Sequence, residues 1–215
     1  MSSPTRPPAE LATGLAKLGL ALRHEAWKSG AARGLSPTQA QLLVALERAP
    51  GRRLGELAAE LGLNEATTSE AVGALVAKKL ARKTRARDDG RALCLAPTAA
   101  GRREARRARQ WPDHFLAALD RLTPEEQGVM LRALTKVIQN LQEEGRIPVA
   151  RMCASCHFFR PHAHRDPERP HHCAFVDAPF GERELRLECA DHEAAPTAER
   201  DSAWRRFVAG GLSTD

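Results

Sequence analysis

The chain has 215 residues, of which 42% are hydrophobic and 28% charged, with 4% aromatic residues and no tyrosine. At roughly 100–200 residues per domain, this length holds one full domain and a smaller appendage, and the mixture of apolar and charged residues argues against wholesale disorder. No apolar run approaches the roughly 18–20 residues that span a bilayer, and the Pro-rich start leads into no signal-peptide core, so we expect a cytoplasmic protein without a membrane partner.

Positive charge is concentrated in the first half of the sequence. The formal net charge is +6, and residues 1–110 hold 20 of the 33 Lys and Arg but 10 of the 27 Asp and Glu. Each cation near a phosphate releases a condensed counterion, so this asymmetry is typical of a half that binds a polyanion. A coding bias toward arginine would give the same composition, and the positions of the cations must decide between the two explanations.

Two helices are predicted before residue 50. Apolar residues recur at helical spacing from Ala9 to about Trp27. The run Ser36-Pro37-Thr38-Gln39 combines an N-cap serine, a proline at the first helical position and a capping-box glutamine. It predicts a helix that stops before Pro50.

A helix-turn-helix is predicted next. Residues 54–61 form a short amphipathic helix, and Gly62 follows in the position that favours a left-handed C-terminal cap. Asn64 then caps a helix through about Lys79. Two helices joined by Gly62-Leu63-Asn64 have the arrangement of a helix-turn-helix.

A hairpin and two further helices complete this region. Segments 81–86 and 91–97 flank Arg87-Asp88-Asp89-Gly90, and Asp-Gly between potential strands predicts a β-hairpin. Thr98 caps a basic helix that Pro112 divides, and Thr123-Pro124-Glu125-Glu126 opens a helix ending near Glu144. A last short helix is expected over 201–208.

The run from Leu54 to Ser69, followed by Asp-Asp-Gly-Arg-Ala from Asp88 and Leu-Ala-Pro-Thr-Ala-Ala-Gly-Arg from Leu95, resembles the MarR family of winged helix-turn-helix repressors. The resemblance covers about residues 10–144. Asp89-x-Arg91 and Thr98-x-x-Gly101 are its specific parts. It implies a mainly α fold with a small β-hairpin wing, and an obligate homodimer, built from the first and last helices of this region, that binds a pseudo-palindromic DNA operator.

The start of the second helix of the helix-turn-helix is the expected reading element, because such residues normally reach base edges in the major groove. Asn64, Thr67, Thr68 and Ser69 carry short polar side chains suited to phosphate or base contacts. Thr68 is also a candidate for the core, where the family usually places an aliphatic residue. Glu70 departs from the family, which often has a basic residue there; a carboxylate accepts from cytosine N4 but repels phosphate.

The predicted wing is the most basic segment. Seven cations occupy fourteen positions: Lys78, Lys79, Arg82, Lys83, Arg85, Arg87 and Arg91. The resemblance implies that Arg91 enters the minor groove and is held by Asp89. A solvated charged face is the alternative, and the hairpin beside a helix-turn-helix favours DNA contact.

Effector pockets in the family lie between the dimerisation helices and the DNA-binding lobe, so His24, Trp27 and Trp111 are candidates to line one for a small-molecule effector. Each is also a candidate for the core or the dimer interface. Cys94 stands alone on the second predicted strand, where we expect a buried inert thiol in preference to a redox sensor.

The composition changes after Arg146, which divides the chain into a domain over 1–146, a Cys/His-rich extension over 147–193 and a tail over 194–215. The extension has the spacing Cys153-x₂-Cys156-x₁₆-Cys173-x₁₅-Cys189. Thiols of a cytoplasmic protein are kept reduced, so a cysteine cluster favours metal binding over disulfides. Two thiolate pairs joined by a loop suit a tetrahedral site.

The metal and its full ligand set stay open. All four cysteines with Zn²⁺ are our first choice, and an iron–sulfur cluster, which also takes four thiolates, is the rival. His171, His172 or His192 is an alternative ligand in place of one cysteine. The extension has few aliphatic residues, so we expect its folding to depend on the metal.

Three classes of function were compared. A DNA-binding regulator, most simply a repressor, agrees with the charge and the motifs. A metal-dependent enzyme needs an open coordination position and a general base, which four cysteines do not leave; no other catalytic motif is found, so no enzyme activity is expected. An adaptor whose extension docks a protein is the third class.

Overall fold

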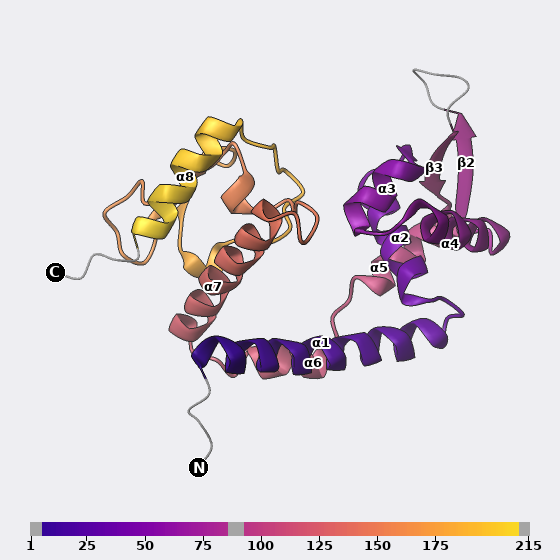
Figure 1. Cartoon of the computed structure of the whole chain (residues 1–215), viewed down its shortest axis with the longest axis horizontal. Helices are drawn as coiled ribbons and strands as arrows, with labels where there is room; N and C mark the ends of the chain where they lie inside the picture. Colours follow the sequence, from indigo (N-terminus) through magenta and orange to yellow (C-terminus); the bar gives the residue numbers. More distant parts are fainter. Residues whose placement is uncertain (1–5, 86–92, 211–215) are drawn as a thin grey trace, which may run out of the picture. The chain divides into compact units, whose positions relative to one another are not determined.

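A computed structural model describes residues 6–85 and 93–210 of the chain. It divides into two compact units, Met1–Asp113 and His114–Asp215. Both are mainly helical with a small antiparallel sheet, so the predicted fold class is confirmed (Figure 1). No helix in the described residues is long and apolar enough to cross a membrane.

The first unit contains five helices at the predicted places. They are α1 (Pro7–Ala31), α2 (Pro37–Arg48), α3 (Leu54–Leu61), α4 (Glu65–Ala77) and α5 (Ala99–Ala108). The capping box of α2 is present, with the Gln39 amide donating to Ser36 Oγ at 3.2 Å and the Ser36 amide to Gln39 Oε1 at 3.4 Å. Helix α1 extends a turn beyond Trp27, where the sequence had predicted its end.

A three-stranded sheet completes the first unit. Strands β2 (Ala81–Arg85) and β3 (Leu93–Pro97) pair antiparallel with Lys83 opposite Leu95, which confirms the hairpin. The predicted turn residues 87–90 lie outside the described residues. Strand β1 (Arg52–Arg53), which the sequence did not predict, adds to the other edge of β3, giving the order β1-β3-β2.

Helix α2 is the centre of the first hydrophobic core. Its residues Leu42, Leu43 and Leu46 are fully buried and pack with Leu57 of α3 and Leu75 of α4. Each fully buried leucine contributes about 1.5–3 kcal/mol relative to an exposed one. The core therefore holds the helix-turn-helix against α2, and the polar residues of α3 and α4 face outward.

The second unit is built around two long helices. It contains α6 (Asp113–Leu119), α7 (Pro124–Glu143) and α8 (Thr197–Ala209). The capping box that begins α7 is present, with Thr123 and Glu126 exchanging hydrogen bonds of 2.8 and 3.2 Å. Helix α8 begins before the predicted residue 201.

Short strands and turns join α7 to α8. A three-stranded antiparallel sheet has the order β4-β5-β6, from β4 (Phe159–Arg160), β5 (His171–Cys173) and β6 (Ala178–Phe180), with 3-10 turns η1 (Cys153–Ser155) and η2 (Glu182–Glu184) on either side. The sequence had indicated little regular structure here.

The small core of the second unit combines the extension with α8. Phe159, Leu185 and Phe207 are buried together. The guanidinium of Arg132, on α7, lies 5.7 Å from the centre of the Phe207 ring and donates to the Phe207 carbonyl at 3.3 Å. The residues after 193, which composition had separated as a tail, thus pack against the extension through α8.

Candidate nucleic-acid interface

Two backbone features and one side-chain cap set the angle between α3 and α4. Gly62 is left-handed with φ 63°, the Leu63 amide donates to the Ala58 carbonyl at 2.9 Å, and Asn64 Oδ1 accepts from the Thr67 amide at 2.7 Å. The Gly62 cap and the Asn64 cap that the sequence predicted are both present. They hold the first turn of α4 in a defined direction.

The first turns of α4 present some of the predicted side chains and bury another. Thr67, Ser69 and Glu70 are exposed, while Thr68 is fully buried and its hydroxyl donates to the Asn64 carbonyl at 2.9 Å. Asn64 is exposed but uses its side chain as the cap. Because Thr68 packs into the core, its hydroxyl does not belong to the outer surface of this helix.

The wing strand β2 carries three exposed cations. Arg82, Lys83 and Arg85 have no carboxylate partner among the residues described by the structure. Their positive charge is therefore available to an external anion. Arg87, Asp89 and Arg91, which the sequence also assigned to this surface, lie outside the described residues.

Lys78 has a different environment from the wing cations. Its Nζ donates to the Gly34 carbonyl and, at 2.8 Å, to Gln39 Oε1. These two contacts join the end of α4 to the start of α2. Lys78 therefore positions the helix-turn-helix on α2, in addition to carrying charge.

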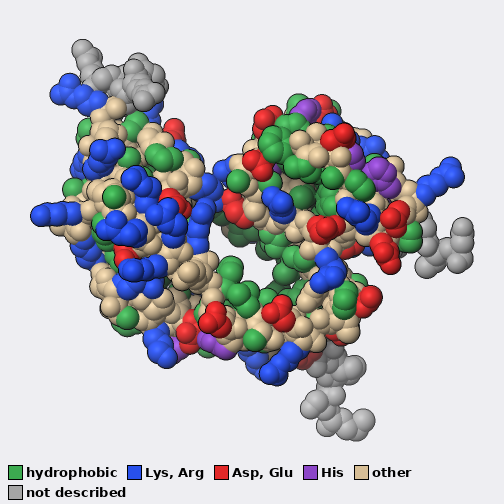
Figure 2. All heavy atoms as spheres, turned by 180° about the vertical axis from the view of Figure 1, so that it is seen from behind, with side chains coloured by type: hydrophobic (Ala, Val, Ile, Leu, Met, Phe, Trp, Pro, Cys, Tyr) green, Lys and Arg blue, Asp and Glu red, His purple; other side chains and the backbone are tan. Residues whose placement is uncertain are grey.

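Three arginines at the C-terminal end of α5 pair with carboxylates of the same unit. Arg106 and Arg109 lie 3.4 and 3.2 Å from the carboxylate of Glu47, and Arg107 lies 2.7 Å from that of Glu104. Figure 2 shows many Lys and Arg side chains over the face of this unit turned toward the viewer. Arg106, Arg107 and Arg109 thus form a paired group at the end of α5. Arg102 and Arg103 of the same helix, like the cations of β2, are exposed and have no carboxylate partner among the described residues.

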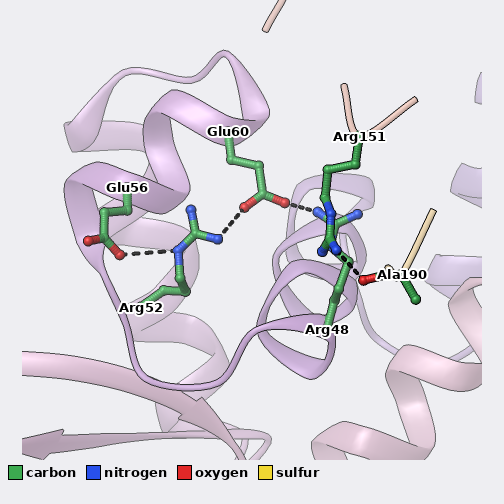
Figure 3. Close-up of polar contacts among 6 residues, drawn as sticks. All are labelled: Arg48, Arg52, Glu56, Glu60, Arg151 and Ala190. Carbon is green, nitrogen blue, oxygen red and sulfur yellow. Dashed lines mark hydrogen bonds and ion pairs between the residues drawn. The ribbon is translucent and has the colours of Figure 1, made fainter. Parts of the chain in front are cut away.

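A second ion-pair network fastens α3 to its neighbours. Arg52 Nε lies 3.1 Å from Glu56 and its Nη1 2.9 Å from Glu60, and Arg48 also pairs with Glu60 (Figure 3). The network links α2, β1 and α3. Sequence reasoning missed it, although Arg52 and Glu56 have the i,i+4 spacing that indicates such a pair.

Two helices expose apolar stripes. On α1, Leu11, Leu15 and Leu18 are exposed, Leu11 to 69%. On α7, Val137 and Leu141 are exposed, whereas the buried residues of that helix are Gly128, Thr135 and Gln139. The apolar stripe of α1 is therefore uncovered within one chain, whereas Leu134 and Ile138 on α7 are half-buried.

The effector candidates are spread over exposed surface. His24 and Trp27 line a shallow depression along one face of α1, together with Leu20, Arg23, Lys28 and Ala31. Trp111 is exposed to 58%. The predicted burial of Cys94 on β3 is confirmed.

The four cysteines of the extension are partly buried and unpaired by disulfides. Burial is the main cause that raises the pKa of the Cys153 thiol to about 11; the backbone amide of Arg186 opposes it, and the nearby thiols of Cys189, Cys156 and Cys173 add to it. The thiols are thus close enough to interact electrostatically. Among the described residues, however, no three His, Cys, Asp or Glu side chains have an arrangement that holds a metal ion as it stands.

Comparisons with known proteins identify this architecture. Residues 33–92 match the model of the MarR family. A MarR protein from Peptoclostridium difficile is 23% identical with a TM-score of 0.58, over 67% of this chain and 94% of that one. No curated protein sequence matches the chain.

Two of the similar structures were determined with DNA. FabT of Streptococcus pneumoniae in complex with DNA is 20% identical with a TM-score of 0.56, over 63% of this chain and 97% of that one. A putative MarR family transcriptional regulator from Listeria monocytogenes complexed with 26mer DNA is 21% identical with a TM-score of 0.54, over 62% and 89%. Residues 33–92 therefore match the MarR family in sequence, and about two thirds of the chain shares the fold of these solved structures.

Proposed function

We propose that the protein is a transcriptional repressor that binds a pseudo-palindromic operator in double-stranded DNA as a homodimer. The observation that carries the proposal is the difference between the two groups of cations. The paired group at the end of α5 faces Glu47 and Glu104, whereas Arg82, Lys83 and Arg85 of β2 are exposed without a carboxylate partner in the described part of the chain. Unpaired cations on a projecting strand attract phosphate and release its counterions.

The proposed base-reading element is the first part of α4. Thr67 and Ser69 are exposed and close to the helix start, where a recognition helix meets the major groove. Glu70 beside them is suited to accept a hydrogen bond from a cytosine amino group. Where no cytosine is within reach, its negative charge repels the DNA phosphates and weakens binding. We therefore expect an operator with a cytosine preference at the position that Glu70 faces.

The homodimer is proposed from the uncovered helices. The stripe of Leu11, Leu15 and Leu18 on a 25-residue helix is unusual for a surface that stays in water. A second copy of the chain, with the same stripe, is the occupant that a two-fold operator requires. Two recognition helices then lie about one DNA turn, roughly 34 Å, apart.

Selection of binding sites from a random-sequence DNA pool by the full-length protein tests the proposal. We expect an enriched inverted repeat whose half-sites are centred about one helical turn apart, and loss of the enrichment when Ser69 is changed to Lys. In a transcription assay in vitro, an operator placed over the promoter should be silenced. Enrichment of no sequence, or of a single half-site without symmetry, would contradict the proposal.

A further inference from the structure

The first two cysteines of the extension form a compact turn. Cys153 begins η1, and the Cys156 amide donates to the Cys153 carbonyl at 2.9 Å. A hydrogen bond from the fourth residue to the first closes the chain on itself and keeps two side chains three positions apart near each other. The spacing of two residues between the cysteines is the one found in pairs that bind zinc.

Backbone hydrogen bonds connect the segment that contains Cys189 to this turn. The Cys189 amide donates to the Arg151 carbonyl at 2.8 Å, and the Cys153 amide donates to the Arg186 carbonyl at 3.0 Å. The guanidinium of Arg151 also donates to the Ala190 carbonyl (Figure 3). The segment 186–190 therefore runs beside 151–153.

Cys173 reaches the same place through the small sheet. It pairs with Phe159, three residues after Cys156, in the β4–β5 ladder. The Ala174 amide donates to the Phe158 carbonyl at 2.9 Å, which extends the pairing by one residue. All four cysteines thus flank one turn, although 36 positions separate the first from the last in the sequence.

Hydrogen-bond donors are directed at two of the sulfurs. The backbone amide of Arg186 donates to Cys153 Sγ at 3.3 Å, and its guanidinium Nη1 lies 3.9 Å from Cys189 Sγ. N–H donors and a cation favour the thiolate, the form in which cysteine binds metals, although burial outweighs them at Cys153 in the metal-free chain. Arg186 thus faces the place where negative charge would collect.

The histidines that the sequence left as alternative ligands have other partners. His171 Nδ1 accepts from the His162 amide at 3.3 Å, and its buried Nε2 lies 3.5 Å from Glu182 without forming a hydrogen bond. Those of His172 face His164 and Asp177, each at 3.2 Å.

His192 is engaged in the same way, because its Nε2 lies 3.0 Å from Ser155 Oγ. Ser155 is itself buried and donates toward main-chain carbonyls of the turn. The imidazole therefore contacts the cysteine turn through Nε2, and the four cysteines remain the first choice of donor set.

We propose that Cys153, Cys156, Cys173 and Cys189 bind one Zn²⁺ per chain in a closed four-thiolate site that braces the extension. The small core of Phe159, Leu185 and Phe207 is the only apolar cluster among the described residues of this unit, and so small a core ordinarily needs a cross-link. Zinc is assigned because closed four-cysteine sites are its commonest structural use. Binding releases the protons of the thiols. The proposal does not depend on DNA binding.

The test uses the full-length protein purified without oxygen or chelators. We expect one zinc per chain by elemental analysis and a colourless solution. Serine substitutions of Cys153, Cys156, Cys173 or Cys189 should each abolish stoichiometric zinc. The controls Cys94→Ala, His172→Asn and His192→Asn should keep it, because Cys94 lies in the other unit and the two imidazoles have other partners.

A second measurement on the unsubstituted protein covers the case in which a serine variant fails to fold. Stepwise titration with a mercurial thiol reagent should release one zinc as four thiols react. Absence of metal, release with fewer thiols, or loss of zinc in a histidine control would overturn the four-thiolate site. A brown protein that contains iron and sulfide would overturn the assignment of zinc.

Discussion

The α-carbon of Gly101, in the first turn of α5, lies directly against the main-chain carbonyl of Leu80, the residue that leads into β2. A β-carbon at position 101 would overlap that carbonyl and press on the Leu43 side chain at 3.3 Å. Thr98 completes the junction, since its hydroxyl accepts from the Gly101 amide at 3.0 Å and donates to the Lys79 carbonyl at 2.8 Å. The Thr98-x-x-Gly101 motif therefore joins α5 to the base of the wing.

Replacing this glycine should destabilise the first unit. We expect Gly101→Ala to lower the free energy of unfolding by about 1–3 kcal/mol, because the overlapping atom is backbone and cannot move aside easily. Urea denaturation followed by circular dichroism measures the change. Gly73→Ala is the matched control: nothing lies within 4 Å of that position on α4, so alanine should stabilise by about 0.5–1 kcal/mol. Equal effects of the two substitutions would rule out this role for Gly101.

Association of two chains should depend on the stripe of α1. Leu15→Asp with Leu18→Asp places two carboxylates where the proposed dimer buries apolar surface, which is costly for an unpaired charge. Light scattering at micromolar concentration should give a dimer for the parent protein and a monomer for the variant. Lys17→Glu, on the same helix between these leucines, should remain dimeric. A parent protein that is monomeric would remove the two-fold geometry.

Stability of the second unit should fall in mild acid. Burial lowers the pKa of His162, the charges of His171 and Arg132 lower it further, and Glu182 opposes them. Because the folded pKa lies below the unfolded value of about 6.5, the unfolded chain takes up the proton first as the pH drops. The free energy of unfolding should therefore be constant above neutrality and decrease below about pH 6.5.

The variant His162→Gln isolates this contribution. It removes the titrating imidazole, whereas any metal that acid releases would be lost equally from the parent protein and the variant. Unfolding followed by Trp204 fluorescence, with Trp27 and Trp111 changed to Phe, should show a shallower decrease between pH 7.5 and 5.5 in the variant. Parallel curves would show that His162 does not contribute.

The starts of the capped helices were the most predictable part of the fold, because their signals are local. Ser36, Asn64 and Thr123 each bond within three residues of themselves, so the pattern is complete in a short stretch of sequence. The hairpin of β2 and β3 was predictable for the same reason. Strand β1 was not, because its two residues have no periodicity and its partner β3 is some forty positions away.

The extension and α7 depended on distant contacts. The strands of the extension are two or three residues long, which is too short for an alternation of apolar and polar residues to appear. On α7 the sequence drew attention to apolar positions, whereas Gly128 is the residue that packs against the turn η2. A β-carbon added at Gly128 would lie 3.3–3.9 Å from atoms of Glu182 and Arg183. Contacts with a turn more than fifty positions later leave no signal in the helix itself.

The candidate interface could be predicted as a region but not residue by residue. Counting cations placed it near the wing, and the exposed Arg82, Lys83 and Arg85 lie there. The sequence could not show that Thr68 faces inward, since neighbouring residues on a helix point in different directions. Nor could it separate paired from unpaired arginines, because Arg106 and its partner Glu47 are 59 positions apart.

The salt dependence of DNA binding tests the central claim most directly. Lys83→Ala with Arg85→Ala removes two unpaired cations of the wing, and Arg106→Ala with Arg107→Ala removes the same charge from the paired group on α5. With the DNA duplex selected by the parent protein, the slope of log affinity against log salt should become less steep for the wing variant by about 0.9 per phosphate contact removed. It should stay unchanged for the α5 variant. Identical slopes for the parent and the wing variant, with both folded, would contradict the account.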